Sequence, residues 1–215
     1  MSVLSKSEAR ALYDRIASRY DLMLVQFKLL GLERHRRRLI RQLDLRCGDT
    51  VVDLCCGTGV NFEYLQNAVG SKGRIIGVDL SSAMLEQAQA KIYEAGWKNI
   101  EVICADVEKW PLPERTDVVL STFGLEMVPG YADVIKQISS SLEPGARFGL
   151  MGLKKPDRWP DWLVRAAIWL SSPFGVSREY EDFQPWKAAR RYLRVRNYRT
   201  MLMGAAYSCV AVKNH

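Results

Sequence analysis

Between residues 50 and 153, short apolar runs rich in β-branched residues alternate with amphipathic segments of helical length. The runs that predict strands are 50–54, 74–78, 100–104, 117–120 and 147–152. The intervening segments repeat apolar residues at helical spacing, and Ser81 or Ser82 is placed to cap one of them. Strands that alternate with helices form parallel sheets buried on both faces, so the sequence predicts a doubly wound, mostly parallel α/β sheet.

Both ends of the chain depart from this alternation. Residues 5–45 have helical periodicity, including a second apolar series at 24–30, and Gly31 is expected to interrupt them. Near the other end, strand-like runs occupy 198–203 and 206–212. The gap between these runs is too short for a crossover helix, so they predict an antiparallel hairpin that ends the sheet.

Charge is distributed unevenly along the chain. The net charge of +7 combines +6 in residues 1–47, −6 in residues 48–153 and +7 in residues 154–215. The basic flanks suit an anionic partner, such as nucleic acid, a phospholipid surface or a negatively charged substrate. Solvated helix faces explain them equally well.

The cysteines and histidines do not predict a metal site. The five cysteines include no Cys-x-x-Cys pair, and His35 and His215 are remote from them in sequence. The odd cysteine count and the lack of a signal-peptide pattern predict a cytoplasmic protein. No apolar stretch approaches the roughly 20 residues that a membrane span requires.

Glycines or polar residues follow four of the predicted strands. The loop Cys55-Cys56-Gly57-Thr58-Gly59 follows the first strand, Asp79 the second, Asp106 the third and Ser121 the fourth. Open α/β sheets bind ligands at the carboxyl ends of their strands. Glycines allow close backbone approach to a ligand, and the two aspartates suit a ribose diol and an adenine amino group respectively.

A dinucleotide is one alternative ligand for such a site. Its phosphate-binding loop needs a third glycine, and Phe62 occupies that position here. Asp53, just inside the first strand, would also repel a pyrophosphate, whereas a carboxylate there suits an ammonium or sulfonium group. The sequence therefore disfavours NAD.

Several segments resemble those of a known family. The successive motifs of class I S-adenosylmethionine-dependent methyltransferases are similar to 51–59, 76–81, 105–106 and 142–145. More narrowly, residues 13–21 together with the loop 55–59 resemble the ubiquinone/menaquinone C-methyltransferases and the related bacterial phosphatidylethanolamine N-methyltransferases. The resemblance covers residues 13–155 and implies a Rossmann-like methyltransferase fold with S-adenosyl-L-methionine as cofactor.

The resemblance also implies a set of cofactor-binding residues. The loop and Tyr20 would hold the methionine part, Asp79 the ribose hydroxyls, and Met84 with the residues after the third strand the adenine. The full set is Tyr20, Asp53, Cys55, Gly57, Thr58, Gly59, Asp79, Leu80, Met84, Asp106, Val107 and Ser121. Two departures stand out: Cys55 replaces the first motif glycine, and Gly124-Leu125-Glu126-Met127 replaces the Gly-Leu-Arg-Asn of the quinone enzymes, which argues against a quinone acceptor.

The methyl acceptor is predicted from the segment 154–194. Transfer from a sulfonium needs alignment and desolvation of the nucleophile, and Glu126 is the candidate catalytic base or amine-orienting carboxylate, with a surface glutamate as the alternative. An apolar, lipid-like acceptor or contact with an anionic membrane suits the aromatic residues Trp159, Trp162, Trp169, Phe174, Phe183 and Trp186. A lid helix packed on the core explains these residues equally. We expect a phospholipid amine or a prenylated aromatic as acceptor.

Two other functions are weighed against this one. The arginines at 34–38 and 190–196 suit RNA methylation, but the chain has no separate RNA-binding module and no Asn-Pro-Pro-Tyr-type motif, so nucleic acid is not an expected partner. The second alternative is a regulator that binds the cofactor without transferring methyl groups.

The expected organisation is one domain of 215 residues, a length typical of a single domain. It would comprise an N-terminal helical cap (1–45), a cofactor-binding core (46–153), a lid or substrate region (154–194) and a terminal hairpin (195–215). The sequence does not indicate an oligomeric state. Peripheral contact of this cytoplasmic protein with a membrane is expected from the lid.

Overall fold

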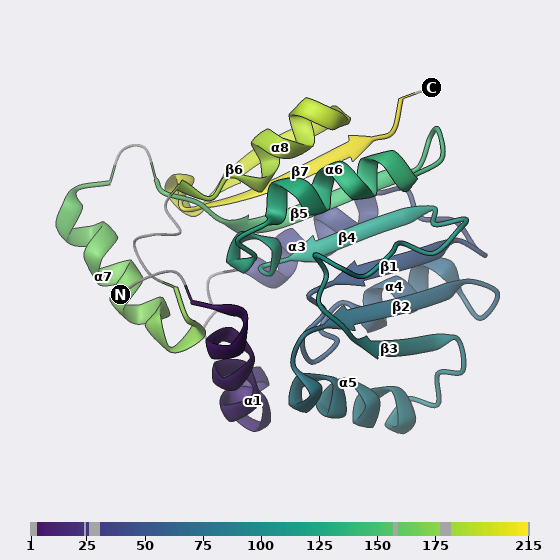
Figure 1. The fold of residues 1–215 in the computed structure, drawn as a ribbon, viewed down its shortest axis with the longest axis horizontal. Coiled ribbons are helices and arrows are strands. Elements are labelled where there is room, and N and C mark those ends of the chain that lie inside the picture. The colour runs from purple at the N-terminus through teal and green to yellow at the C-terminus, as the bar shows by residue number, and fades with distance from the viewer. Residues whose placement is uncertain (1–3, 24, 26–30, 157–158, 177–181, 215) are drawn as a thin grey trace.

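The computed structural model describes residues 4–23, 25, 31–156, 159–176 and 182–214. The apolar series expected at 24–30 falls outside this part of the chain, apart from residue 25. In the described residues, strands form one sheet with the order β3-β2-β1-β4-β5-β7-β6 (Figure 1). The strands are β1 Thr50–Leu54, β2 Arg74–Asp79, β3 Ile100–Cys104, β4 Val118–Thr122, β5 Arg147–Leu153, β6 Arg194–Met201 and β7 Ala206–Val212.

The directions of the strands confirm the predicted fold class. Adjacent strands from β3 to β5 run parallel, and β7 runs antiparallel to both β5 and β6. The second strand of the hairpin, not the first, therefore pairs with the parallel part of the sheet. The result is a doubly wound, mostly parallel α/β sheet that ends in an antiparallel hairpin.

The first hairpin strand begins earlier than the sequence predicts. β6 starts at Arg194 instead of residue 198, and exposed arginines alternate with half-buried residues along its first half. This pattern is that of an edge strand with one face in solvent, so it lacks the apolar run that marks a buried strand. Leu202 and Met203 then form the turn with φ angles of 51° and 50°.

Helices cover both faces of the sheet. The side chains of α3, α4 and α5 pack on one face and those of α6 and α8 on the other. The described helices are α1 Lys6–Met23, α3 Leu32–Gln42, α4 Phe62–Val69, α5 Ser82–Glu94, α6 Tyr131–Ser141, α7 Asp161–Ser171 and α8 Pro185–Tyr192. None of them combines the length and the apolarity needed to cross a lipid bilayer.

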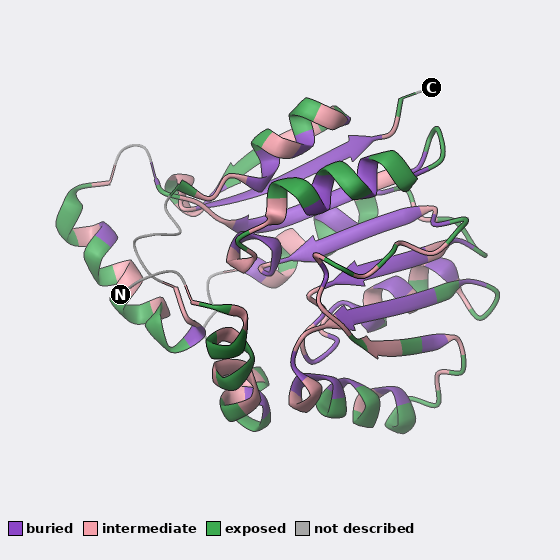
Figure 2. Cartoon of the chain, viewed as in Figure 1, coloured by how far each residue is buried: buried purple, intermediate pink, exposed green. Residues whose placement is uncertain are grey.

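Two helices lie off the faces of the sheet. α1 and α7 stand beyond the carboxyl ends of the parallel strands, where the strand order reverses between β1 and β4 (Figure 1). The central strands are buried on both faces, whereas α1 and α7 are largely exposed or half-buried (Figure 2). In sheets of this topology the reversal opens a crevice for ligands, because the loops after the two strands lead to opposite faces.

The position of Trp186 corrects one expectation about the lid. Trp186 was expected to lie over the site, but only 7% of it is exposed and its ring centroid lies 4.6 Å from that of Tyr207 on β7. α8 packs beside α6 and presents Trp186 and Ala189 to the sheet. α8 (Pro185–Tyr192) therefore belongs to the core and not to a lid, because it covers the antiparallel strands that α6 leaves open.

The buried hydroxyl of Tyr207 generates a prediction about stability. Its oxygen has no hydrogen-bond partner in the described residues, and an unsatisfied buried hydroxyl costs about 1–3 kcal/mol. We expect Tyr207→Phe to leave the free energy of unfolding unchanged or to raise it by about 1 kcal/mol. Tyr207→Ala, which also removes the ring, should lower it by about 3–5 kcal/mol. Urea denaturation measures both, and a clear loss of stability in Tyr207→Phe would contradict the assignment.

Candidate active site

Two adjoining cavities open at the carboxyl ends of the parallel strands. The small cavity has a volume of about 100 Å³ and the large cavity about 920 Å³. Both are lined by the same six residues, which form the junction between them: Tyr13, Tyr20, Cys55, Gly57, Phe123 and Met127. A single ligand can therefore extend from one cavity into the other.

The small cavity gathers residues from the ends of β2 and β3. Besides the junction residues, its walls include five residues of the predicted cofactor set, namely Asp79, Leu80, Met84, Asp106 and Val107. Asp79 accepts hydrogen bonds from the backbone N–H groups of Gly57 at 2.8 Å and Ser81 at 3.0 Å. Burial raises the pKa of Asp79 above its usual value, although these hydrogen bonds favour the ionised form and lower the pKa in part. Ser81 caps α5 as predicted, because its hydroxyl accepts a hydrogen bond from the backbone N–H of Met84 at 3.1 Å.

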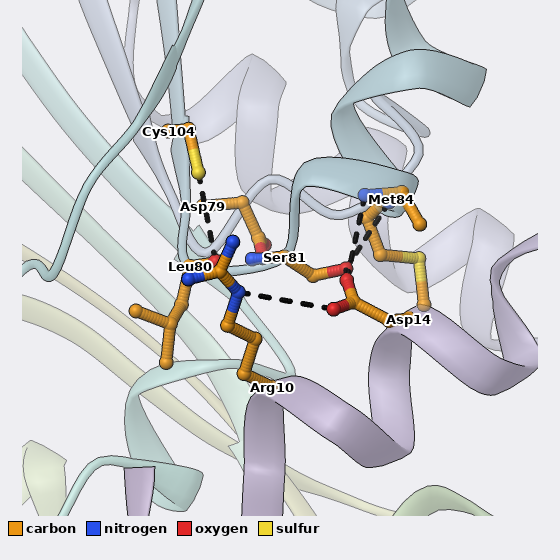
Figure 3. A network of polar contacts seen from close by, with 8 residues as sticks. Arg10, Asp14, Asp79, Leu80, Ser81, Met84 and Cys104 are labelled. Atoms are coloured by element: carbon orange, nitrogen blue, oxygen red, sulfur yellow. Dashed lines mark hydrogen bonds and ion pairs between the residues drawn. The ribbon is translucent and has the colours of Figure 1, made fainter. Parts of the chain in front are cut away.

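Helix α1 forms the roof of the small cavity. Its Lys6 contacts Asp106 at 2.6 Å, Asp14 accepts a hydrogen bond from the hydroxyl of Ser81 at 2.5 Å, and Asp21 accepts one from Thr58 at 2.6 Å. These side chains recur every seven or eight residues and hence lie on one face of the helix. Figure 3 shows Arg10 and Asp14 of α1 reaching toward the loop that follows β2. The spacing is visible in the sequence, but the partners of these residues are not.

The loop after β1 has a strained conformation at Cys55. Cys55 has a φ of 54°, a region that side chains other than glycine rarely adopt. A Cβ atom on Gly124 would lie 2.3 Å from that of Cys55, so glycine is required at 124 for the two loops to meet. Cys55 thus takes over the backbone geometry of the glycine that it replaces, as expected for a small change to the motif.

Asp53 lies behind the loop and outside both cavities. It is fully buried, and both of its carboxylate oxygens accept hydrogen bonds from the amide of Asn61, at 3.1 and 3.0 Å. The same amide donates to the hydroxyl of Thr122 at 3.0 Å. Burial raises the pKa of Asp53 to about 7. Asn61 was missed by sequence reasoning because an asparagine before a helix indicates an N-cap, whereas here its side chain makes no capping bond.

The other predicted cofactor residues divide into two groups. Tyr20, Cys55, Gly57 and Gly59 line the large cavity, and the first three also line the small one. Thr58 and Ser121 line neither cavity: Thr58 ties the loop to α1, and the buried hydroxyl of Ser121 has no partner in the described residues. The structure therefore brings nine of the twelve predicted residues to the cavities and places Asp53, Thr58 and Ser121 in supporting positions.

Glu126 is a buried acid on the wall of the large cavity. It lies on the short helix η1 (Leu125–Met127), is 6% exposed, and accepts a hydrogen bond from the backbone N–H of Leu153 at 3.1 Å. It forms no ion pair with a described residue. Burial raises its pKa to about 7. A carboxyl group with such a pKa in an apolar cavity can accept a proton near neutral pH.

The opposite wall of the large cavity is apolar. It includes Trp159 and Phe174 of the expected lid, together with three residues on the inner face of α7: Val164, Ala167 and Ile168. Trp162 and Trp169 point away from this wall and are 69% and 77% exposed. The aromatic stripe predicted for the lid is therefore divided between the cavity and the surface, while Phe183 packs on Tyr131 elsewhere.

The charges around Cys55 reveal the electrostatic character of the junction. Burial raises the pKa of this thiol well above its usual value, and the nearby carboxyl groups of Asp79, Glu126, Asp53 and Asp106 raise it further. These acids come from the ends of four parallel strands. Burial raises the pKa of Asp106, but hydrogen bonds from Lys6 and from the backbone N–H of Glu108, together with the charge of Lys6, lower it below its usual value. A positively charged ligand would be stabilised at the junction.

Comparisons with known proteins agree with this geometry. The model of the ubiE/COQ5 methyltransferase family matches residues 1–166. A demethylmenaquinone methyltransferase from Lactococcus lactis subsp. lactis is 35% identical over 150 residues, which span 68% of this chain and 59% of that protein. A protein of the same name from Listeria monocytogenes serotype 4a is 28% identical over 100% of this chain and 93% of its own length.

Solved structures share the fold at low sequence identity. A SAM-dependent methyltransferase from Aquifex aeolicus aligns with a TM-score of 0.63 and 21% identity, covering 83% of this chain and 89% of that one. The [4+2]-cyclase SpnF aligns with a TM-score of 0.77 and 13% identity, covering 100% and 98%. The sequence resemblance is thus confirmed by the family match: the chain belongs to the ubiE/COQ5 methyltransferase family and is an S-adenosylmethionine-dependent methyltransferase.

Proposed function

We propose that this methyltransferase acts on a ring carbon of a prenylated aromatic quinol that binds in the large cavity. The observation that carries the proposal is a buried carboxyl group, Glu126, facing a cavity of about 920 Å³ that has an apolar wall formed by Trp159, Phe174 and α7. That volume lies near the upper end of the range for small-molecule sites, roughly 300–1,000 Å³. The relatives named demethylmenaquinone methyltransferases support an acceptor of this class.

The residues of the small cavity and the junction fit the cofactor. Asp79 accepts backbone hydrogen bonds from Gly57, Leu80 and Ser81, which leaves about one of the roughly four lone-pair sites of a carboxylate for a ribose hydroxyl. The carboxyl groups around Cys55 suit a sulfonium. When bound, S-adenosylmethionine supplies a methyl group that is already activated toward transfer. Leu80, Met84 and Val107 provide apolar contacts for the adenine.

Glu126 supplies the proton acceptor that ring methylation needs. In its ionised form it takes the proton from the ring hydroxyl, which raises the electron density at the neighbouring ring carbon. Methylation of that carbon displaces its hydrogen, which returns as a proton to the ring oxygen when aromaticity is restored, so the proton on Glu126 is the one released overall. The apolar wall formed by Val164, Ile168 and Phe174 excludes water from this carbon. The quinone enzymes place arginine at the position of Glu126, so this chain would use a different group on the same loop. A quinol, with an ionisable hydroxyl, suits a carboxylate base better than a phospholipid amine does.

We further propose that a membrane delivers the acceptor. The outer face of α7 exposes Trp162, Trp169 and Leu170, and Arg165 lies between them on the same helix. The inner face of that helix lines the large cavity. The bilayer interface and the large cavity would therefore be separated by the width of one helix, so a lipid acceptor could pass from the membrane into the cavity over a short distance. Tryptophan side chains favour this interface because their rings are amphipathic.

The first prediction concerns the cofactor. We expect Asp79→Asn to weaken the binding of S-adenosylhomocysteine roughly 10- to 100-fold, because a hydrogen bond to a charged group contributes about 1.5–3 kcal/mol. Isothermal titration calorimetry measures the change. Asp133→Asn, an exposed acid on α6, is the matched control and should bind as the wild type does. Equal affinity in Asp79→Asn would show that the cofactor does not bind here.

The second prediction concerns Glu126. With a pKa of about 7, the carboxyl is protonated and inactive in acid, so kcat should rise with pH up to about 7 and then level. We expect Glu126→Gln to lower kcat about 10²- to 10⁴-fold and to remove this dependence. The assay uses a chemically reduced naphthoquinol with a short prenyl chain. Exposed Glu143→Gln is the control. Methylation of phosphatidylethanolamine but not of the quinol would overturn the proposed acceptor.

Stability provides a check on the same variant. The pKa of Glu126 is higher in the folded than in the unfolded chain, so its contribution favours folding at low pH and is lost as the pH rises from about 4.5 to 7. Glu126→Gln should therefore be at least as stable as the wild type at pH 8. Lost activity would then reflect chemistry and not unfolding.

The third prediction concerns the membrane. We expect the wild type to float with vesicles of phosphatidylglycerol and phosphatidylcholine at low salt. The double variant Trp162→Ser/Trp169→Ser should lose at least about tenfold in affinity, since it removes two large apolar side chains from the interface. Tyr93→Ser on α5, which alters an equally exposed aromatic residue, is the control. Wild-type protein that stays unbound at low salt would rule out this route.

A further inference from the structure

Arg36 places a positive charge inside the large cavity. In sequence it belongs to a run of arginines, of which Arg34, Arg37 and Arg38 are exposed. Arg36 differs because it lies four residues after Leu32 and three before Leu39, both of which are buried against the sheet. Helical periodicity therefore turns this one arginine inward, where it lines the cavity.

The guanidinium group of Arg36 has no acidic partner among the residues that the structure describes. Its Nε atom is buried without a hydrogen-bond partner, and the group forms no ion pair with a described residue. Glu33, the nearest acid on the same helix, is instead bound to Tyr64 at 2.7 Å and to Arg37 at 3.7 Å. Burial lowers the pKa of Arg36, although Tyr20 and the charge of Asp53 oppose this shift. Arg36 as a whole is half-buried, but its Nε atom is buried and unbonded, so a ligand that supplied an anion would satisfy this donor.

The position of Arg36 identifies which part of a ligand it would meet. Its guanidinium carbon lies 5.9 Å from the centroid of the Phe123 ring, and Phe123 lines both cavities. Tyr20 is another residue of the junction, and the positive charge of Arg36 lowers the pKa of its hydroxyl in part, against the raising effect of burial. Arg36 therefore lies on the large-cavity side of the junction, opposite the small cavity whose residues fit adenosine.

We propose that Arg36 binds the carboxylate of the cofactor's methionine tail. With adenosine in the small cavity and the sulfur at the junction, the tail extends into the large cavity on the side of Arg36. A guanidinium offers paired N–H donors that match the two oxygens of a carboxylate. The cofactor would then be held by negative charge around its sulfonium and by positive charge at its anionic end.

The test compares two ligands that differ in the tail. S-adenosylhomocysteine carries the carboxylate, whereas 5′-methylthioadenosine has the same adenosine and a thioether but no amino-acid tail. We expect Arg36→Gln to weaken S-adenosylhomocysteine roughly 10- to 100-fold by calorimetry and to leave methylthioadenosine within about twofold. Arg38→Gln, an exposed neighbour on the same helix, should change neither affinity.

Three outcomes would overturn the proposal. Equal loss for both ligands would mean that Arg36 only supports the fold of the cavity. No loss for either would mean that it does not contact the cofactor, and a higher KM for the acceptor alone would assign its charge to that substrate instead. Because both ligands bind without an acceptor, failure of the proposed quinol function would leave this result unaffected.

Thermal unfolding gives an independent readout. Without ligand, Arg36→Gln should melt at or above the wild-type temperature, because it removes a charged group whose buried Nε atom has no hydrogen-bond partner in the described residues. With saturating S-adenosylhomocysteine, its increase in melting temperature should be smaller than that of the wild type. Should Arg36→Gln fail to fold, Arg36→Lys keeps the charge but not the paired donors, and the same difference between the two ligands should be seen in reduced form.

Discussion

Negative charge gathered at the carboxyl edge of the sheet is the constraint around which this molecule is organised. Asp79, Asp106 and Glu126 reach the cavities from the ends of three parallel strands, and Asp53 lies buried just behind them. Carboxyl groups this close together raise one another's pKa unless a cation offsets them. Burial holds Asp53 and Glu126 near a pKa of 7, so the edge of the sheet is poised between the charged and neutral forms.

Some of the positive charges near this edge come from helices α1 and α3. Lys6 of α1 pairs with Asp106 and Glu108 over the small cavity, and Arg36 of α3 reaches the large one. Acids thus cluster at the ends of the parallel strands, while cations reach the cavities from several elements, including Lys91 of α5 and Lys154 after β5.

How much of the site the sequence predicts depends on the kind of signal. Asp79 and Asp106 were predictable because a strand end followed by an acid defines a position at the sheet edge. Asn61 was not, since its contact with Asp53 joins residues whose roles look unrelated in sequence. Arg36 was hidden in a charged run, and only the buried positions of Leu32 and Leu39 single it out. Trp186 was assigned to the lid because the sequence does not distinguish an aromatic residue that lines a cavity from one that packs on a sheet.

By itself, the sequence determined the alternation of strands and helices, the family, the cofactor and the strand ends where acids collect. These follow from local periodicity and from short motifs, which need no knowledge of distant contacts. Only the tertiary structure decided that β7 and not β6 pairs with β5, that α1 roofs the small cavity, and that α7 turns one face to the cavity and two tryptophans outward. Those features depend on pairing and burial between segments far apart in the chain, and no local pattern encodes which of several apolar surfaces will meet.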